Sequence, residues 1–111
     1  MRYRRLGGTG LIVSELCLGT RPFGNGEGRF KPVAGVDRAG ADAFVERSLA
    51  AGVNFFDTAD CYSGGQSEQI LGRSPKTIGV KRSDVIIATK ASSDVGTGPN
   101  DRSSSRGQQS F

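Results

Sequence analysis

The sequence has no histidine, only two cysteines and no long apolar run. Without histidine, Ser14 and its neighbour Glu15 cannot form a serine-hydrolase triad. Cys17 and Cys61 lie in apolar or site-like contexts without a secretory signal, which favours reduced thiols over a disulfide. Cys61 also lacks a CxxC partner, which disfavours a reactive thiol. These absences argue against a hydrolase and against a metal site.

No stretch approaches the roughly 18 apolar residues of a membrane-spanning helix. Glycines and Glu15 follow the arginines near the N-terminus, where a signal peptide would need an apolar core. We therefore expect a cytoplasmic protein with no membrane partner. The net charge of +4 arises from 15 scattered basic residues, and only two tyrosines are present for base stacking, so no nucleic-acid partner is expected.

The chain does contain a succession of short apolar runs separated by glycine-rich and polar segments. Residues 3–6 and 11–13 flank the sequence GGTG, which predicts a β-hairpin. Short apolar runs bounded by turn signals are typical of strands in a parallel sheet. On this basis we expect three further strands, at residues 16–19, 53–56 and 85–89.

A helical pattern fills the interval between the first two of these strands. Asp37 can cap a helix with apolar positions at i, i+3, i+4, i+7 and i+8, in which one position is polar. Gly52 would end this helix. The positions expected on its buried face are Ala41, Phe44, Val45, Ser48 and Leu49.

A second, shorter helix is expected to follow Ser67 as its N-cap and to continue to Leu71. Pro75 and Gly79 are expected to stop it. The loop before the first helix contains GNGEG at residues 24–28, but its spacing is GxGxG and not GxGxxG, and prolines flank it. We interpret it as a flexible loop and not as a dinucleotide-binding fingerprint.

Two of the predicted strands end in charged residues that can act together. Asp57 and Lys90 are separated by about the length of one strand–helix–strand unit, so both should lie at the same rim of the sheet. A lysine ammonium near a phenol favours the phenolate, which would make Tyr62 a better general acid toward a carbonyl oxygen, while Asp57 would hold and charge-balance Lys90. Taken singly, a turn carboxylate, a packing tyrosine and a solvated lysine are the simpler interpretations.

Four stretches together resemble the N-terminal part of the aldo-keto reductase family. They are residues 3–24, residues 52–72 (GVNFFDTADCYSGGQSEQILG), residues 85–90 (VIIATK) and, more weakly, residues 98–106. The resemblance implies a (β/α)8 barrel that reduces aldehydes and ketones to alcohols with a nicotinamide cofactor, usually NADPH. It implies that Asp57, Tyr62 and Lys90 are catalytic. The family's fourth catalytic residue, a histidine, has no counterpart in this sequence.

The same resemblance implies the cofactor contacts. Gly19, Thr20 and Arg21, in the loop after the first barrel strand, are expected to bind NADPH together with Asp57. The expected partner is a small-molecule carbonyl substrate. The identity of that substrate, the choice between NADPH and NADH, and the oligomeric state are left open by the sequence.

The length of the chain limits the fold. A closed (β/α)8 barrel takes roughly 250 residues, and this chain has 111. We therefore expect an α/β fold made of an N-terminal hairpin plus about three βα units of an incomplete (β/α)8 TIM barrel. Residues 1–111 are interpreted as the truncated N-terminal part of a reductase domain, and residues 91–111, which lack apolar periodicity, as a disordered tail. The alternative is a non-catalytic truncated remnant, or a module that pairs its exposed strand edges with a partner barrel.

Overall fold

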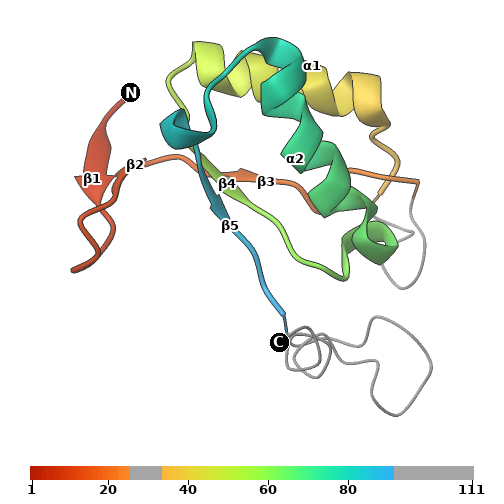
Figure 1. Ribbon diagram of the computed structural model, residues 1–111, viewed down its shortest axis with the longest axis horizontal. Coiled ribbons are helices and arrows are strands. Elements are labelled where there is room, and N and C mark those ends of the chain that lie inside the picture. Colours follow the sequence, from red (N-terminus) through yellow and green to blue (C-terminus); the bar gives the residue numbers. More distant parts are fainter. Residues whose placement is uncertain (26–33, 92–111) are drawn as a thin grey trace.

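The computed structural model describes residues 1–25 and 34–91, which form two small sheets and two helices (Figure 1). In chain order the elements are β1 Tyr3–Arg5, β2 Ile12–Ser14, β3 Leu18–Gly19, α1 Arg38–Ala50, β4 Phe55–Asp57, α2 Gln66–Ile78 and β5 Ile86–Ala88. Short 3-10 turns at Tyr62–Gly65 and Arg82–Asp84 precede α2 and β5. The expected tail lies outside the described residues from position 92 onward, and most of the GNGEG segment lies outside them as well.

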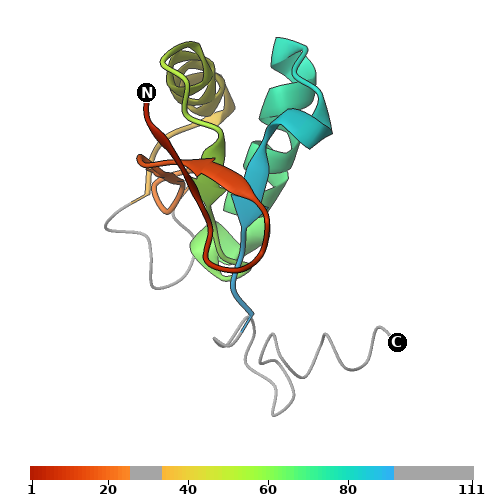
Figure 2. The same cartoon turned by 90° about the vertical axis from the view of Figure 1, so that its left-hand side faces the viewer.

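The predicted hairpin is present and is attached to the start of β4. β1 and β2 pair in antiparallel fashion, with Tyr3 opposite Ser14. The Asn54 side chain accepts a hydrogen bond from the Ser14 backbone N–H at 2.8 Å and donates one to the Ile12 carbonyl oxygen at 3.1 Å. The Tyr3 hydroxyl donates to the Gly52 carbonyl oxygen at 2.7 Å. The hairpin stands beside the sheet and apart from the two helices (Figures 1 and 2).

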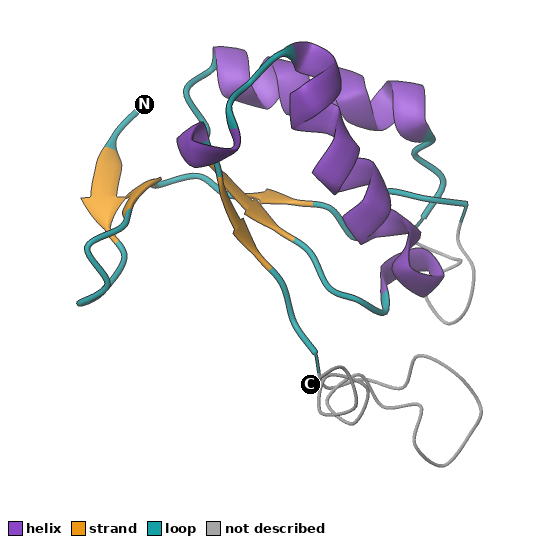
Figure 3. Ribbon diagram, viewed as in Figure 1, coloured by secondary structure: helices purple, strands orange, loops and turns teal. Residues whose placement is uncertain are grey.

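The second sheet is parallel, with the strand order β3-β4-β5. Its two cross-strand rows are Leu18–Phe56–Ile87 and Gly19–Asp57–Ala88. Because side chains alternate between the faces of a sheet, the first row faces the helices and the second faces away from them. Both helices cover the same face (Figure 3). Within the described residues the sheet has three strands and does not close into a barrel.

The α/β class expected from the sequence is confirmed, and the number of βα units is not settled. Two units, β3-α1 and β4-α2, are followed by β5, and a third helix would fall outside the described residues. Each strand is shorter than its apolar run. Val53 and Val85, for example, are buried in the core but precede the paired residues of their strands. An apolar run in the sequence therefore predicts which residues are buried. The bounds of the strand depend instead on which residues form backbone hydrogen bonds with a neighbouring strand.

Helix α1 begins and ends as expected. The Asp37 carboxylate accepts a hydrogen bond from the Gly40 N–H at 2.8 Å. At the C-terminus, Gly52 has a φ of 93°, and the Val53 N–H donates to the Ser48 carbonyl oxygen at 2.9 Å, as in a Schellman motif.

The expectation that Phe44 lies on the buried face of α1 is wrong, because its side chain is 53% exposed. Ala41 and Val45 are fully buried, and Phe44 lies about 100° around the helix from Val45. Its ring instead lies near that of Phe23, with the centroids 6.5 Å apart. The buried stripe is therefore narrower than the apolar pattern suggested.

Helix α2 differs more from its prediction. It extends to Ile78, its N-cap is Gly65, and Ser67 lies inside the first turn with a buried side chain. Ser67 therefore does not cap the helix. Pro75 lies inside the last turn and does not stop the helix, which continues to Ile78. Gly79, with a φ of 85°, ends the helix as expected.

The core lies between the sheet and the two helices. Its buried members are Phe23, Ala41, Val45, Val53, Phe56, Leu71 and Val85. Neither helix of the described part of the chain is long and apolar enough to span a membrane.

Candidate active site

Backbone hydrogen bonds connect the C-terminal ends of the three parallel strands. The Thr20 N–H donates to the Asp57 carbonyl oxygen at 2.9 Å, and the Thr58 N–H donates to the Ala88 carbonyl oxygen at 2.8 Å. Asp57, the last residue of β4, is thus held between the segments that follow β3 and β5.

The Lys90 ammonium lies at this rim, as the spacing of the sequence predicts. Its Nζ is 2.9 Å from both carboxylate oxygens of Asp57 and 2.8 Å from the Thr58 carbonyl oxygen. The hydrogen bond to Asp57 raises the pKa of Lys90 above its ordinary value, and Tyr62 adds a smaller increase. Lys90 is therefore cationic at neutral pH, although half of its side chain is exposed.

Tyr62 lies against the same ammonium. Nζ of Lys90 is 5.4 Å from the centroid of the Tyr62 ring, within the range of a cation–π contact. Tyr62 begins a turn in which Ser63, Gly64 and Gly65 all have positive φ values. The same turn leaves no room for a side chain at Gly24, where an added Cβ would lie 2.5 Å from the Ser63 Cβ.

A hollow of about 320 Å³ opens beside these groups. It is lined by Gly19, Thr20, Arg21, Pro22, Asp57 and Tyr62. Five of these six are residues that the sequence selected for catalysis or cofactor binding. Lys90, the sixth selected residue, does not line the hollow but contacts Asp57 and Tyr62. The size is at the lower end of the range for small-molecule sites, roughly 300–1,000 Å³.

The thiol of Cys17 lies close enough to the rim for the charges of Asp57 and Lys90 to shift its pKa. Cys17 is exposed, but partial desolvation of its thiol raises the thiol pKa, and the Asp57 carboxylate raises it further, while Lys90 partly opposes this. The thiol is therefore protonated at neutral pH, which argues against a nucleophilic role.

The sequence did not identify a group of buried hydroxyls beside the hollow. Thr58 was not singled out, and Ser67 was interpreted as a helix cap, yet the two side chains meet in the interior. The available signal was a polar residue on the buried side of an apolar pattern, but such a residue has no distinctive spacing.

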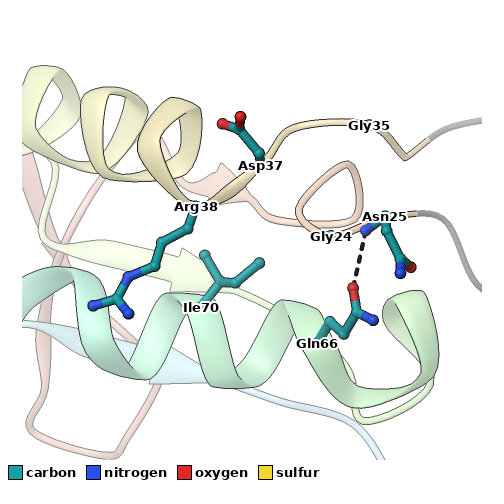
Figure 4. Close-up of a pocket in the computed structure, with 7 residues that line it drawn as sticks. All are labelled: Gly24, Asn25, Gly35, Asp37, Arg38, Gln66 and Ile70. Carbon is teal, nitrogen blue, oxygen red and sulfur yellow. Dashed lines mark hydrogen bonds between the residues drawn. The ribbon is translucent and has the colours of Figure 1, made fainter.

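A second hollow, of about 290 Å³, lies between the starts of the two helices (Figure 4). Its lining residues are Gly24, Asn25, Gly35, Asp37, Arg38, Gln66 and Ile70. The Asn25 N–H donates to Oε1 of Gln66 at 2.9 Å across its mouth. This hollow includes none of Asp57, Tyr62 and Lys90.

Comparison with known proteins gives consistent relatives. The model of the Aldo/keto reductase family matches residues 15–110. A probable voltage-gated potassium channel subunit beta from Oryza sativa subsp. japonica is 40% identical over 107 residues, which are 96% of this chain and 30% of that protein. L-galactose dehydrogenase from Arabidopsis thaliana is 46% identical over 87 residues, which are 78% of this chain and 25% of that protein.

The structural comparison agrees. The holo form of the aldo-keto reductase AKR11C1 from Bacillus halodurans superimposes with a TM-score of 0.70 and 32% identity, over 92% of this chain and 30% of that one. The chain thus spans about a quarter to a third of the length of its relatives. Since the family match covers both parallel-strand units and all the residues at the rim, the chain belongs to the aldo/keto reductase family.

Proposed function

We propose that this chain supplies the proton-donor side of an NADPH-dependent reductase that converts aldehydes or ketones to alcohols. The observation that carries the proposal is the placement of one ammonium, that of Lys90, between the Asp57 carboxylate and the Tyr62 ring. Membership of the family supports an oxidoreductase in general. The assignment of roles to these residues is ours.

The proposed proton donor is Tyr62. Its hydroxyl proton would pass to the carbonyl oxygen of the substrate as that oxygen gains negative charge. The Lys90 ammonium would stabilise the phenolate that Tyr62 becomes. Asp57 would keep Lys90 in place by accepting hydrogen bonds with both carboxylate oxygens. Since the sequence has no histidine, these three residues carry the proton chemistry that this chain can provide.

The residues beside the hollow fit a flat nicotinamide ring. A Cβ built on Gly19 would meet no atom within 4 Å, so the end of β3 is open toward the hollow. Gly19, Thr20, Arg21 and Asp57 would hold the cofactor, and the exposed Arg21 guanidinium is suited to an oxyanion such as a phosphate. When bound, the cofactor supplies the hydride that adds to the carbonyl carbon.

A second candidate function is pairing with a partner through unpaired strand edges. Within the described residues, β3 and β5 each have one free edge, and the face of the sheet opposite the helices carries no second layer. Gel filtration of the purified protein tests pairing between two copies of the chain. A monomer at micromolar concentration would rule out such pairing.

The decisive experiment compares the two tyrosines of the chain. NADPH binding is measured by fluorescence titration, and NADPH oxidation in the presence of a small aldehyde as acceptor is measured by absorbance, with circular dichroism of the same samples. We expect Tyr62→Phe to abolish oxidation and to leave the fold intact. Tyr3→Phe is the matched control, because it removes only the hydroxyl that bonds the Gly52 carbonyl oxygen. Undiminished oxidation by the Tyr62→Phe protein would rule out the proposed mechanism.

A further inference from the structure

Three buried hydroxyls from three different elements meet beside the hollow. Thr20 follows β3, Thr58 follows β4, and Ser67 lies in the first turn of α2. All three residues are at most 2% exposed. Oγ of Ser67 lies 2.9 Å from Oγ1 of Thr20, 3.2 Å from Oγ1 of Thr58 and 2.7 Å from the Thr20 carbonyl oxygen.

Ser67 lies at the centre of this cluster. A serine hydroxyl has one proton to donate and two lone pairs to accept. Ser67 donates to the Thr20 carbonyl oxygen, which is its shortest contact, and its Oγ also lies within hydrogen-bond distance of the Thr20 and Thr58 hydroxyls. The Thr20 hydroxyl in turn lies 3.2 Å from the Asp57 carbonyl oxygen, to which it can donate. Ser67 is therefore the member of the cluster that contacts both of the others.

The cluster is joined directly to the catalytic rim. The backbone N–H of Thr20 donates to the Asp57 carbonyl oxygen at 2.9 Å. The carbonyl oxygen of Thr58 accepts from Nζ of Lys90 at 2.8 Å. Both residues bonded to Ser67 therefore hold parts of the Asp57–Lys90 pair through their main chains.

The start of α2 is held by side chains of its first turn and not by a capping side chain. Its N-cap, Gly65, makes no side-chain capping hydrogen bond, and the preceding turn contains two glycines. Tyr62 begins that turn, so its position depends on where α2 starts.

Within the first turn of α2, Ser67 is bonded to the residues that follow β3 and β4, and Glu68 accepts a hydrogen bond from the Thr89 hydroxyl after β5 at 2.5 Å. Oε1 of Gln66 accepts from the Asn25 N–H on the side away from the strands. Ser67 is thus the buried one of these links.

We propose that Ser67 is a positioning residue that sets the place of Tyr62 relative to the Lys90 ammonium by joining α2 to the ends of β3 and β4. The effect on catalysis rests on the proposed function. The effect on geometry does not, and it can be measured without turnover.

The geometric test uses the magnetic field of the Tyr62 ring. Because Nζ of Lys90 is 5.4 Å from the ring centroid, the ε-methylene protons of Lys90 should show a ring-current shift by NMR. The Tyr62→Leu protein supplies the unshifted reference. We expect Ser67→Ala to lose most of this shift.

Ser74 offers a matched control in the same helix. It is as fully buried as Ser67, but its hydroxyl bonds Asp42 and the Ile70 carbonyl oxygen, away from the rim. Ser74→Ala should lower stability in a similar way and leave the Lys90 shift unchanged. If Ser67→Ala does not fold, Thr58→Val replaces it, because that change removes one hydrogen bond of the cluster and keeps the size of the side chain.

The kinetic test separates positioning from binding. We expect Ser67→Ala to lower kcat about 10- to 100-fold, as a misplacement of about 1 Å can, with little change in the dissociation constant of NADPH. Ser74→Ala should keep kcat. Equal behaviour of the Ser67 and Ser74 variants, or a wild-type Lys90 signal identical to that of Tyr62→Leu, would overturn the inference. A ring-current shift lost only in Ser67→Ala, in a protein that does not oxidise NADPH, would uphold the inference and reject the proposed function.

Discussion

Among single residues at the rim, Lys90 makes three hydrogen bonds through its ammonium. Its ammonium bonds both oxygens of Asp57 and the Thr58 carbonyl oxygen. These three acceptors hold the ammonium in one place even though the side chain is 51% exposed. The charge beside Tyr62 is therefore a consequence of one well-placed lysine.

The titration of Lys90 has a predictable effect on stability. Since its pKa is raised in the folded state, its contribution is fully present below the ordinary lysine pKa of about 10.4 and is lost as the pH rises through the folded pKa. We expect the difference in unfolding free energy between wild type and Lys90→Met to be small, under about 1 kcal/mol because of solvent screening. Urea denaturation should show this difference constant from pH 6 to 9 and falling above that range. A difference that grows at high pH would contradict the assignment.

Ser63 is a strained residue whose replacement should stabilise the protein. Its backbone φ is 50°, a value that residues other than glycine rarely adopt. Its buried hydroxyl has no hydrogen-bond partner among the described residues. We expect Ser63→Gly to raise the unfolding free energy by roughly 0.5–1.5 kcal/mol, measured by thermal denaturation. Ser63→Ala keeps the backbone strain and removes only the hydroxyl, so it separates the two effects. Destabilisation by both changes would show that the hydroxyl has a partner.

At the scale of elements, side-chain hydrogen bonds attach the hairpin and helix α2 to the parallel sheet. The hairpin is attached through Asn54 and Tyr3, and α2 is attached to the strand ends through Ser67. These contacts lie at opposite ends of the parallel sheet. One end is fastened by the hairpin, and the other carries the hollow.

Removal of the Asn54 side chain should release the hairpin without melting the sheet. Asn54→Ala loses the bonds to the Ser14 N–H and the Ile12 carbonyl oxygen, at a cost of roughly 1–3 kcal/mol. Hydrogen exchange should accelerate in β1 and β2 and remain slow in β4. Thr9→Ala, which alters only the tip of the hairpin, is the control and should leave the strand amides protected. Unchanged exchange in Asn54→Ala would show that the hairpin is held by other contacts.

At the scale of the whole molecule, one small core supports the site. Phe56 is fully buried in the row that faces the helices, and its neighbour Asp57 faces the opposite side. The core and the rim are therefore built from successive residues of one strand.

Two phenylalanines test how far the fold depends on this core. Phe56→Ala should cost about 3–5 kcal/mol and lower the melting temperature by more than about 12 °C. Phe44→Ala should cost less than about 1 kcal/mol, because Phe44 is half exposed and its ring centroid lies 6.5 Å from that of Phe23. Circular dichroism melts of both proteins check the pair. Similar losses for the two variants would show that α1 packs differently.

Much of the fold could be predicted because it depends on local patterns. The hairpin follows from GGTG between two short runs, α1 from Asp37 and Gly52, and the adjacency of Asp57 and Lys90 from their spacing. The errors arose where distant contacts decide. Ser67 has a good cap signal, yet it points inward because Thr20 and Thr58 offer it three hydrogen bonds there.

The amino-acid sequence by itself determined the family of this protein, the order of its strands and helices, and which charged residues stand at the strand ends, because these depend on short motifs and on the period of apolar residues. The tertiary structure alone decided the distances at this rim, with the Lys90 ammonium 2.9 Å from the Asp57 carboxylate and 5.4 Å from the centroid of the Tyr62 ring, and it alone decided that Ser67 joins three elements. The physical reason is that these contacts connect residues from separate elements, so their distances and directions exist only once the helices have packed on the sheet.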